Sequence, residues 1–128
     1  MMMNERRIEC PTGRRSVELT FVGSVPFGAD FFSLRATGFS PPWSANTLIG
    51  EAVWTPDGSR LVVTIFHDVH AGRAPDVELV VATFDGERVA THTLARVDRV
   101  PAIDGVSNDA VVVWLRGVRE QFSFPSKC

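Results

Sequence analysis

Tyrosine, lysine and long apolar runs are what this sequence lacks most clearly. Its 128 residues include no tyrosine, and lysine occurs once, at Lys127. No segment approaches the roughly 20 consecutive apolar residues that a membrane-spanning helix needs. The first residues, Met1–Ile8, do not contain the apolar core of a secretion signal. These absences predict a cytoplasmic protein with no membrane partner.

A strong excess of charge of either sign is also missing. The formal net charge is -2, whereas dedicated nucleic-acid-binding domains usually carry a large basic excess or a basic face. Arg6, Arg7, Arg14 and Arg15 do cluster near the start of the chain, but a short arginine-rich arm is commonly a solvated tail. The lack of tyrosine also weakens any scheme of base stacking. We expect no nucleic-acid partner.

The chain has only two cysteines, Cys10 and Cys128, close to its two ends. A disulfide between them would close nearly the whole chain and would stabilise the fold by about 4 kcal/mol on the loop-entropy model. Reduced thiols are the commoner state in the cytosol, so we expect two thiols and keep the disulfide as the alternative. Without a CxxC spacing, the cysteines do not indicate a zinc site.

Short catalytic motifs are absent as well. The sequence contains no GxSxG nucleophile elbow, no HExxH zinc helix, no GxxxxGK[ST] phosphate loop and no GxGxxG dinucleotide fingerprint. Acid–base pairs that are distant in sequence can still meet in a fold. The pattern nevertheless favours a protein that is not an enzyme and that holds no cofactor.

What the sequence does contain is the pattern of β-structure. Between Glu51 and Phe66, the turn residues Pro56-Asp57-Gly58 separate two apolar runs rich in β-branched residues. Proline presets φ, aspartate bonds back to the backbone and glycine accepts a positive φ, so this segment predicts a hairpin. A second hairpin is predicted at Asp85-Gly86, a pair that suits a two-residue type I′ turn.

Similar runs recur along the chain, each bounded by glycine, proline, aspartate or asparagine, and no window shows a helical stripe. They predict about eight strands, at Val17–Val22, Asp30–Ala36, Leu48–Trp54, Arg60–His67, Val77–Phe84, Arg88–Ala95, Ala110–Arg116 and Arg119–Phe124. A single turn of helix is the alternative structure for Val97–Ile103, where Pro101 limits its length.

The alternation of apolar and polar residues along each strand predicts which strand faces are buried. In 60–67 and in 110–116 apolar residues occupy both faces, and Trp114 is one of them. In the strand at 119–124 residues of different polarity alternate regularly, so one of its faces should be exposed to solvent. Sheets that are covered on both sides require two packed layers. The predicted fold is therefore all-β: a single-domain antiparallel β-sandwich at 16–128, preceded by a flexible or edge-strand arm at 1–15.

One stretch resembles a known structural unit. Trp54-Thr-Pro-Asp-Gly-Ser-Arg-Leu-Val-Val-Thr64 looks like the W-S-P-D-G-x-x-L signature of TolB-type and WD40-type propeller blades. The strands that follow fall where the third and fourth strands of a blade would lie, so the resemblance covers 49–95. A closed propeller needs at least four blades of about 40 residues each, more than this chain contains. The resemblance implies a blade-like meander within the sandwich and assigns no functional residue.

The most polar long connection, His67–Asp76, contains two of the three histidines. His67, His70, Asp68 and Asp76 carry side chains that can ligate metals. A glycine and a proline predict a loop here, however, and a loop gives these ligands no fixed spacing. We therefore predict a solvated loop that contacts a partner and binds no metal, and a metal site is the alternative.

A second loop is predicted at 38–46, where Phe39 and Trp43 accompany two prolines. Tryptophan is enriched among interface hot spots, so Trp43 is a candidate binding anchor. The alternative role for Trp43 is to close one end of the sandwich. The third histidine, His92, is predicted to lie opposite Leu79 as a half-buried packed side chain without a catalytic role.

These observations predict a non-enzymatic protein-binding domain, a monomer or small homo-oligomer. The specific hypothesis is a small bacterial immunity- or antitoxin-like protein that occludes a cognate toxin. Its predicted contact residues are Phe39, Trp43, His67, Asp68, His70, Arg73 and Asp76. Two alternatives stay open: a small-ligand- or metal-binding sandwich, with or without enzymatic activity, that uses the 67–76 loop, and a structural subunit that self-assembles through exposed edge strands.

Overall fold

The computed structural model describes residues 5–13, 16–24, 30–36, 43–68, 76–86, 88–97 and 101–125, and every regular element in these ranges is a strand. The strands are β1 (Glu5–Glu9), β2 (Ser16–Ser24), β3 (Asp30–Ala36), β4 (Trp43–Trp54), β5 (Arg60–Asp68), β6 (Asp76–Asp85), β7 (Arg88–Val97), β8 (Ala102–Val106), β9 (Ala110–Leu115) and β10 (Val118–Ser123). The all-β prediction is confirmed. A helix capable of crossing a membrane is not found among the described residues.

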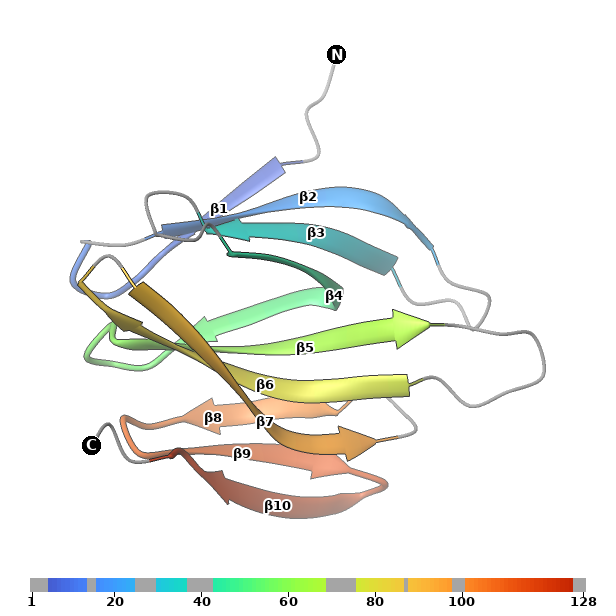
Figure 1. The fold of residues 1–128 in the computed structure, drawn as a ribbon. Helices are drawn as coiled ribbons and strands as arrows, with labels where there is room; N and C mark the ends of the chain where they lie inside the picture. The colour runs from blue at the N-terminus through green and yellow to red at the C-terminus, as the bar shows by residue number, and fades with distance from the viewer. Residues whose placement is uncertain are drawn as a thin grey trace.

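The strands form two antiparallel sheets. The larger sheet has seven strands in the order of the sequence, β1 to β7, and the smaller sheet has the order β10-β9-β8. In Figure 1 the smaller sheet lies below β5 and β6, and β7 crosses in front of β6 down to the level of β8. The meander β4-β5-β6-β7, which contains most of the blade-like stretch, is continuous with β1-β2-β3 in one sheet.

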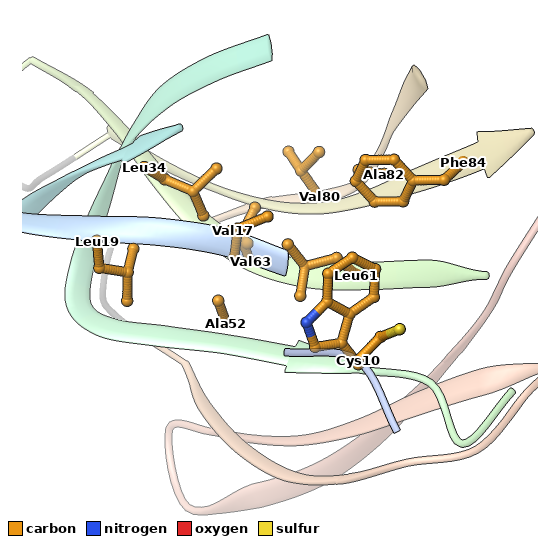
Figure 2. Packing of buried hydrophobic residues seen from close by; sticks show 11 residues of the cluster. Cys10, Val17, Leu19, Leu34, Ala52, Leu61, Val63, Val80, Ala82 and Phe84 are labelled. Carbon is orange, nitrogen blue, oxygen red and sulfur yellow. The ribbon is translucent and has the colours of Figure 1, made fainter. Parts of the chain in front are cut away.

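The larger sheet curls, because strands that are distant in its order meet across its inner face. Trp54 Nε1 on β4 donates a hydrogen bond to the carbonyl oxygen of Ile8 on β1 at 3.1 Å, although β2 and β3 separate these strands. Figure 2 shows labelled side chains from β2 to β6 pointing into one common interior. This first core is the cluster Cys10, Val17, Leu19, Leu34, Ala52, Trp54, Leu61, Val63, Val80, Ala82 and Phe84.

The opposite face of β5 and β6 packs against the smaller sheet. Val62, Leu79 and Val81 from the larger sheet form a second buried cluster with Val111 and Val113 of β9. Alternation on β5 divides its side chains between the two cores, since Leu61 and Val63 belong to the first and Val62 to the second. β5 is therefore covered on both faces, as its apolar pattern predicts.

Two local predictions are wrong. The strand predicted to begin at Leu48 begins at Trp43, so Trp43 is not in a loop. The alternative of a helical turn at 97–103 does not hold, since Val97 ends β7 and Ile103 belongs to β8. Ile103 pairs with Val113 and packs in the second core, a long-range pairing that the local sequence does not reveal.

The register of the second hairpin also differs from the prediction. Asp85 pairs with Arg88, so Asp85 is the last paired residue of β6 and not the first residue of the turn. This shift of two positions places His92 opposite Val81 instead of Leu79. The His92 side chain is exposed and not half-buried. Aspartate is common at the position that precedes a turn, and this preference competes with the Asp-Gly turn pattern.

Candidate functional site

The tip of the β4–β5 hairpin is held by one carboxylate oxygen. Asp57 Oδ1 accepts hydrogen bonds from Thr55 Oγ1 at 2.7 Å, from the Ser59 amide at 2.9 Å and from Ser59 Oγ at 2.8 Å. Gly58 follows with φ of +73°, the left-handed conformation that glycine adopts without steric cost. The Pro-Asp-Gly turn predicted from the sequence is thus present, and three hydrogen bonds to Asp57 Oδ1 stabilise it.

This hairpin tip also joins distant parts of the chain. The Asp57 amide donates to Asn108 Oδ1 in the β8–β9 turn at 2.9 Å. On the other side, the Cys10 thiol is buried 3.0 Å from Thr12 Oγ1, and a Cβ at Gly58 would lie 3.2 Å from the Cys10 sulfur. The tip therefore packs against the turn after β1 and bonds to the smaller sheet.

Arg60, the first residue of β5, is an arginine whose side chain is only 6% exposed. Its Nη1 donates to the Asn108 carbonyl oxygen at 3.1 Å and its Nη2 to the Pro125 carbonyl oxygen at 2.8 Å. The guanidinium carbon lies 5.3 Å from the centre of the Phe124 ring. The Nε–H has no hydrogen-bond partner, and no described carboxylate pairs with the group. Arg60 is a buried cation held by neutral acceptors.

Arg60 borders a groove of about 480 Å³, which we call the basic groove. Arg60 pairs across the sheet with Thr83, and Thr83 pairs with Ala90. Cross-strand partners in an antiparallel sheet point to the same face, so Thr83 and Ala90 form a floor of small side chains beside Arg60. Pro125, which follows β10, lines the groove as well.

Two further basic residues lie on the same face of β7. Arg88 and His92 stand two positions on either side of Ala90, and alternate residues of a strand share a face. Both line the basic groove together with Asp85, the cross-strand partner of Arg88. At about 3.3 Å per residue, Arg88 and His92 are each about 7 Å along the strand from Ala90. Among the described residues, three basic side chains and one carboxylate therefore surround the small-residue floor.

The smaller sheet has one face in the second core and one open face. Trp114 lies on the open face of β9 and is 45% exposed, a large fraction for a tryptophan. The prediction that the 110–116 strand is covered on both faces is wrong, because only Val111 and Val113 are fully buried. On β10 the expected alternation holds, with Phe122 against the core and Arg119 exposed.

The side chains around Trp114 leave its indole ring exposed to solvent. Its cross-strand partners are Ala102 on β8 and Arg119 on β10. Arg119 Nε donates to Asp104 Oδ2 at 3.1 Å, an ion pair between the two outer strands. The next pairs on this face join Val112 to Gly105 and to Gln121. We call this surface the Trp114 face: Ala102, Gly105, Val112, Trp114, Arg119 and Gln121.

The contact residues predicted from the sequence lie at the other end of β5. His67 and Asp68 end this strand, and Asp76, which pairs with Asp68, begins β6. Trp43 begins β4, and the pairing of Thr47 with Ile65 puts this start beside the end of β5. Phe39, His70 and Arg73 lie outside the described residues, as do the side chains of Trp43, His67, Asp68 and Asp76.

Sequence reasoning missed Arg60 and Trp114 as functional candidates. Arg60 is visible in the sequence as the second residue after Pro-Asp-Gly, but its burial depends on the β8–β9 turn and on the chain after β10. Trp114 stands in an apolar run that reads equally well as fully covered. In the part of the chain that the structure describes, no three His, Cys, Asp or Glu side chains are grouped closely enough to hold a metal ion.

Comparisons of the chain with known protein families, with curated proteins and with solved structures gave no match. The resemblance of 49–95 to a propeller blade therefore stays a prediction.

Proposed function

We propose that this chain is a non-enzymatic domain that binds another protein through the Trp114 face. The observation that supports this most directly is Trp114 itself, 45% exposed on the central strand of the smaller sheet. Tryptophan is among the residues most enriched at binding hot spots, because a rigid aromatic side chain buries a large area at a small cost in conformational entropy.

The surroundings of Trp114 support the same role. Ala102 and Gly105 on β8 are small, and a Cβ at Gly105 would meet nothing within 4 Å. A partner surface can therefore approach the side of the indole ring. Arg119 and Asp104 are exposed next to it and already paired. An apolar centre with polar residues at its edge is the usual composition of a protein–protein interface.

Within this class we retain the hypothesis of a small bacterial immunity- or antitoxin-like protein that occludes a cognate toxin in the cytoplasm. Such a protein requires a stable scaffold and one complementary surface of standard size. Two of the residues predicted from the sequence as contacts are Trp43, which begins β4, and Asp68, which ends the neighbouring β5. The same experiment can test Trp43.

The test uses the tagged wild-type protein, Trp114→Ala, Trp43→Ala and Val118→Ala as parallel baits in native host lysate, read by mass spectrometry. Val118 is the matched control, because it is an exposed apolar residue (56%) whose strand partner is Leu115, off the Trp114 face. We expect one protein, recovered in stoichiometric amount by wild type, Trp43→Ala and Val118→Ala, and lost with Trp114→Ala.

Other outcomes contradict the proposal. Loss with Trp43→Ala and retention with Trp114→Ala would move the interface to the end of the sheet where β4 begins. Recovery of no partner, together with Trp114-dependent self-association in light scattering, would favour the structural-subunit alternative. Equal recovery by all four baits would exclude both surfaces.

A further inference from the structure

We propose that the basic groove is a binding site for the phosphate group of a small molecule. The proposal does not depend on the protein-binding function, since the Trp114 face and the groove are formed by different strands. It begins from the arginines of the described residues and their charge partners.

Among the described arginines, the two at the groove, Arg60 and Arg88, form no ion pair with a described carboxylate, and the same holds for the exposed Arg35. Arg7, Arg96 and Arg119 each form an ion pair, with Glu9, Glu78 and Asp104 respectively. No ion pair joins Arg88 to Asp85, although the two are cross-strand partners. Two guanidinium groups therefore face one groove with their charge available.

Of the two arginines at the groove, Arg60 has the stronger need for an anion, because it is buried and Arg88 is exposed. A buried cation is normally compensated by an anion, because carbonyl oxygens replace only part of the lost hydration. Arg60 is 6% exposed, and among the described residues its guanidinium donates to the carbonyl oxygens of Asn108 and Pro125. These bonds use one N–H of each terminal nitrogen, and guanidinium has five N–H groups. Further donors remain for an anion at the edge of the groove.

The arrangement of the lining residues fits a phosphate better than a single carboxylate. A phosphate monoester carries up to two negative charges and three acceptor oxygens, and arginine forks match its geometry. Arg60 lies on one side of the Thr83–Ala90 floor, at about 10 Å from Ala90 across two strand spacings, and Arg88 and His92 flank Ala90 on β7. Asp85 lowers the net positive charge, so a dianion is needed for strong attraction to both arginines.

The groove also has room for an organic part of the ligand. Its volume of about 480 Å³ lies within the range of small-molecule sites. Ala90 and Pro125 contribute apolar surface to its lining. We therefore expect a phosphate attached to a small apolar or aromatic group to bind more tightly than inorganic phosphate.

The test is an NMR titration of the labelled full chain with inorganic phosphate, phenyl phosphate and benzoate at constant ionic strength. We expect saturable shifts of the amides in 83–92, with a dissociation constant of about 1 mM or lower for phenyl phosphate. Arg88→Gln should weaken binding by about tenfold, the usual effect of losing one charge-assisted pair. Arg96→Gln, the same change on the other face of β7, should leave binding unchanged.

Three results would overturn the assignment. The first is an absence of saturable shifts up to high millimolar phenyl phosphate. The second is benzoate binding as tightly as phenyl phosphate, which would indicate a carboxylate or an aromatic site. The third is that Arg88→Gln and Arg96→Gln weaken phosphate binding equally, which would show that binding depends only on the net charge of the protein. Arg88 is exposed, so folding of both variants can be verified from the resonances outside the groove.

Discussion

Gly58 combines two constraints at one residue. Its φ is +73°, and an added Cβ would lie 3.2 Å from the Cys10 sulfur and from Thr12 Oγ1. Gly86 has a comparable φ of +58°, but a Cβ there would meet nothing within 4 Å. The two glycines therefore separate the cost of the backbone conformation from the cost of the contact.

We predict that Gly86→Ala lowers the free energy of unfolding by about 1 kcal/mol, the cost of a left-handed alanine. Gly58→Ala should lower it clearly more, because the Cys10 side chain must also move out of a packed core. Urea unfolding of both variants measures the difference. Equal losses would show that the turn after β1 does not pack against the hairpin tip as described.

Arg116 is the described non-glycine residue with a positive φ, at 56°, and Gly117 follows at 77°. Leu115 pairs with Val118, so these two residues form the turn between β9 and β10. Positive φ at both positions is the type I′ geometry, which favours Asn-Gly. Arg116→Asn should therefore raise the free energy of unfolding by about 0.5 kcal/mol. A decrease in urea unfolding would mean that the arginine side chain stabilises the turn by more than its strain.

At the scale of the element, β9 shows how one strand serves two purposes. Val113 is buried between the sheets, and its neighbour Trp114 lies on the open face. Val113→Ala should lower the free energy of unfolding by about 2 kcal/mol through loss of core packing. Trp114→Ala should change it by less than about 1 kcal/mol, as surface substitutions usually do. Thermal and urea unfolding measure both losses. A larger loss for Trp114→Ala than for Val113→Ala would contradict the assignment of Val113 to the core and of Trp114 to the open face.

The sequence predicted elements well where the local pattern matched the final packing. β3 has the predicted bounds, Asp30–Ala36, and β5 begins at the predicted Arg60. β8 was missed because its five residues, Ala102–Val106, are mostly exposed and are held by pairing with β9. The face of Trp114 could not be predicted either, since alternation gives two faces and the covering layer decides which one is buried.

At the scale of the whole molecule, the two sheets are joined by the second core and by Arg60. Val62 and Val81 pack against Val111 and Val113, and Arg60 bonds to the Asn108 and Pro125 carbonyl oxygens beyond the larger sheet. We therefore predict a single cooperative unfolding transition, with coincident curves from far-UV circular dichroism and tryptophan fluorescence. Separate transitions would show that the smaller sheet unfolds independently.

The curl of the larger sheet was beyond sequence-based prediction for a related reason. Period-2 patterns indicate which residues share a face, but they do not indicate that β4 reaches β1 through the bond from Trp54 to Ile8. The basic groove arises in the same way, because Arg60, Thr83 and Ala90 come from three strands and Pro125 from the end of another sheet. Such sites depend on pairing register, which a single sequence specifies only weakly.

The measurement that tests the proposed function most directly is the dissociation constant of the purified partner for wild type, Trp114→Ala and Val118→Ala, determined by calorimetry. We predict at least a tenfold weakening with Trp114→Ala, the effect of removing a hot-spot tryptophan, and less than about a twofold change with Val118→Ala. Unchanged affinity of Trp114→Ala in a variant that folds normally would contradict the assignment of the Trp114 face as the binding surface.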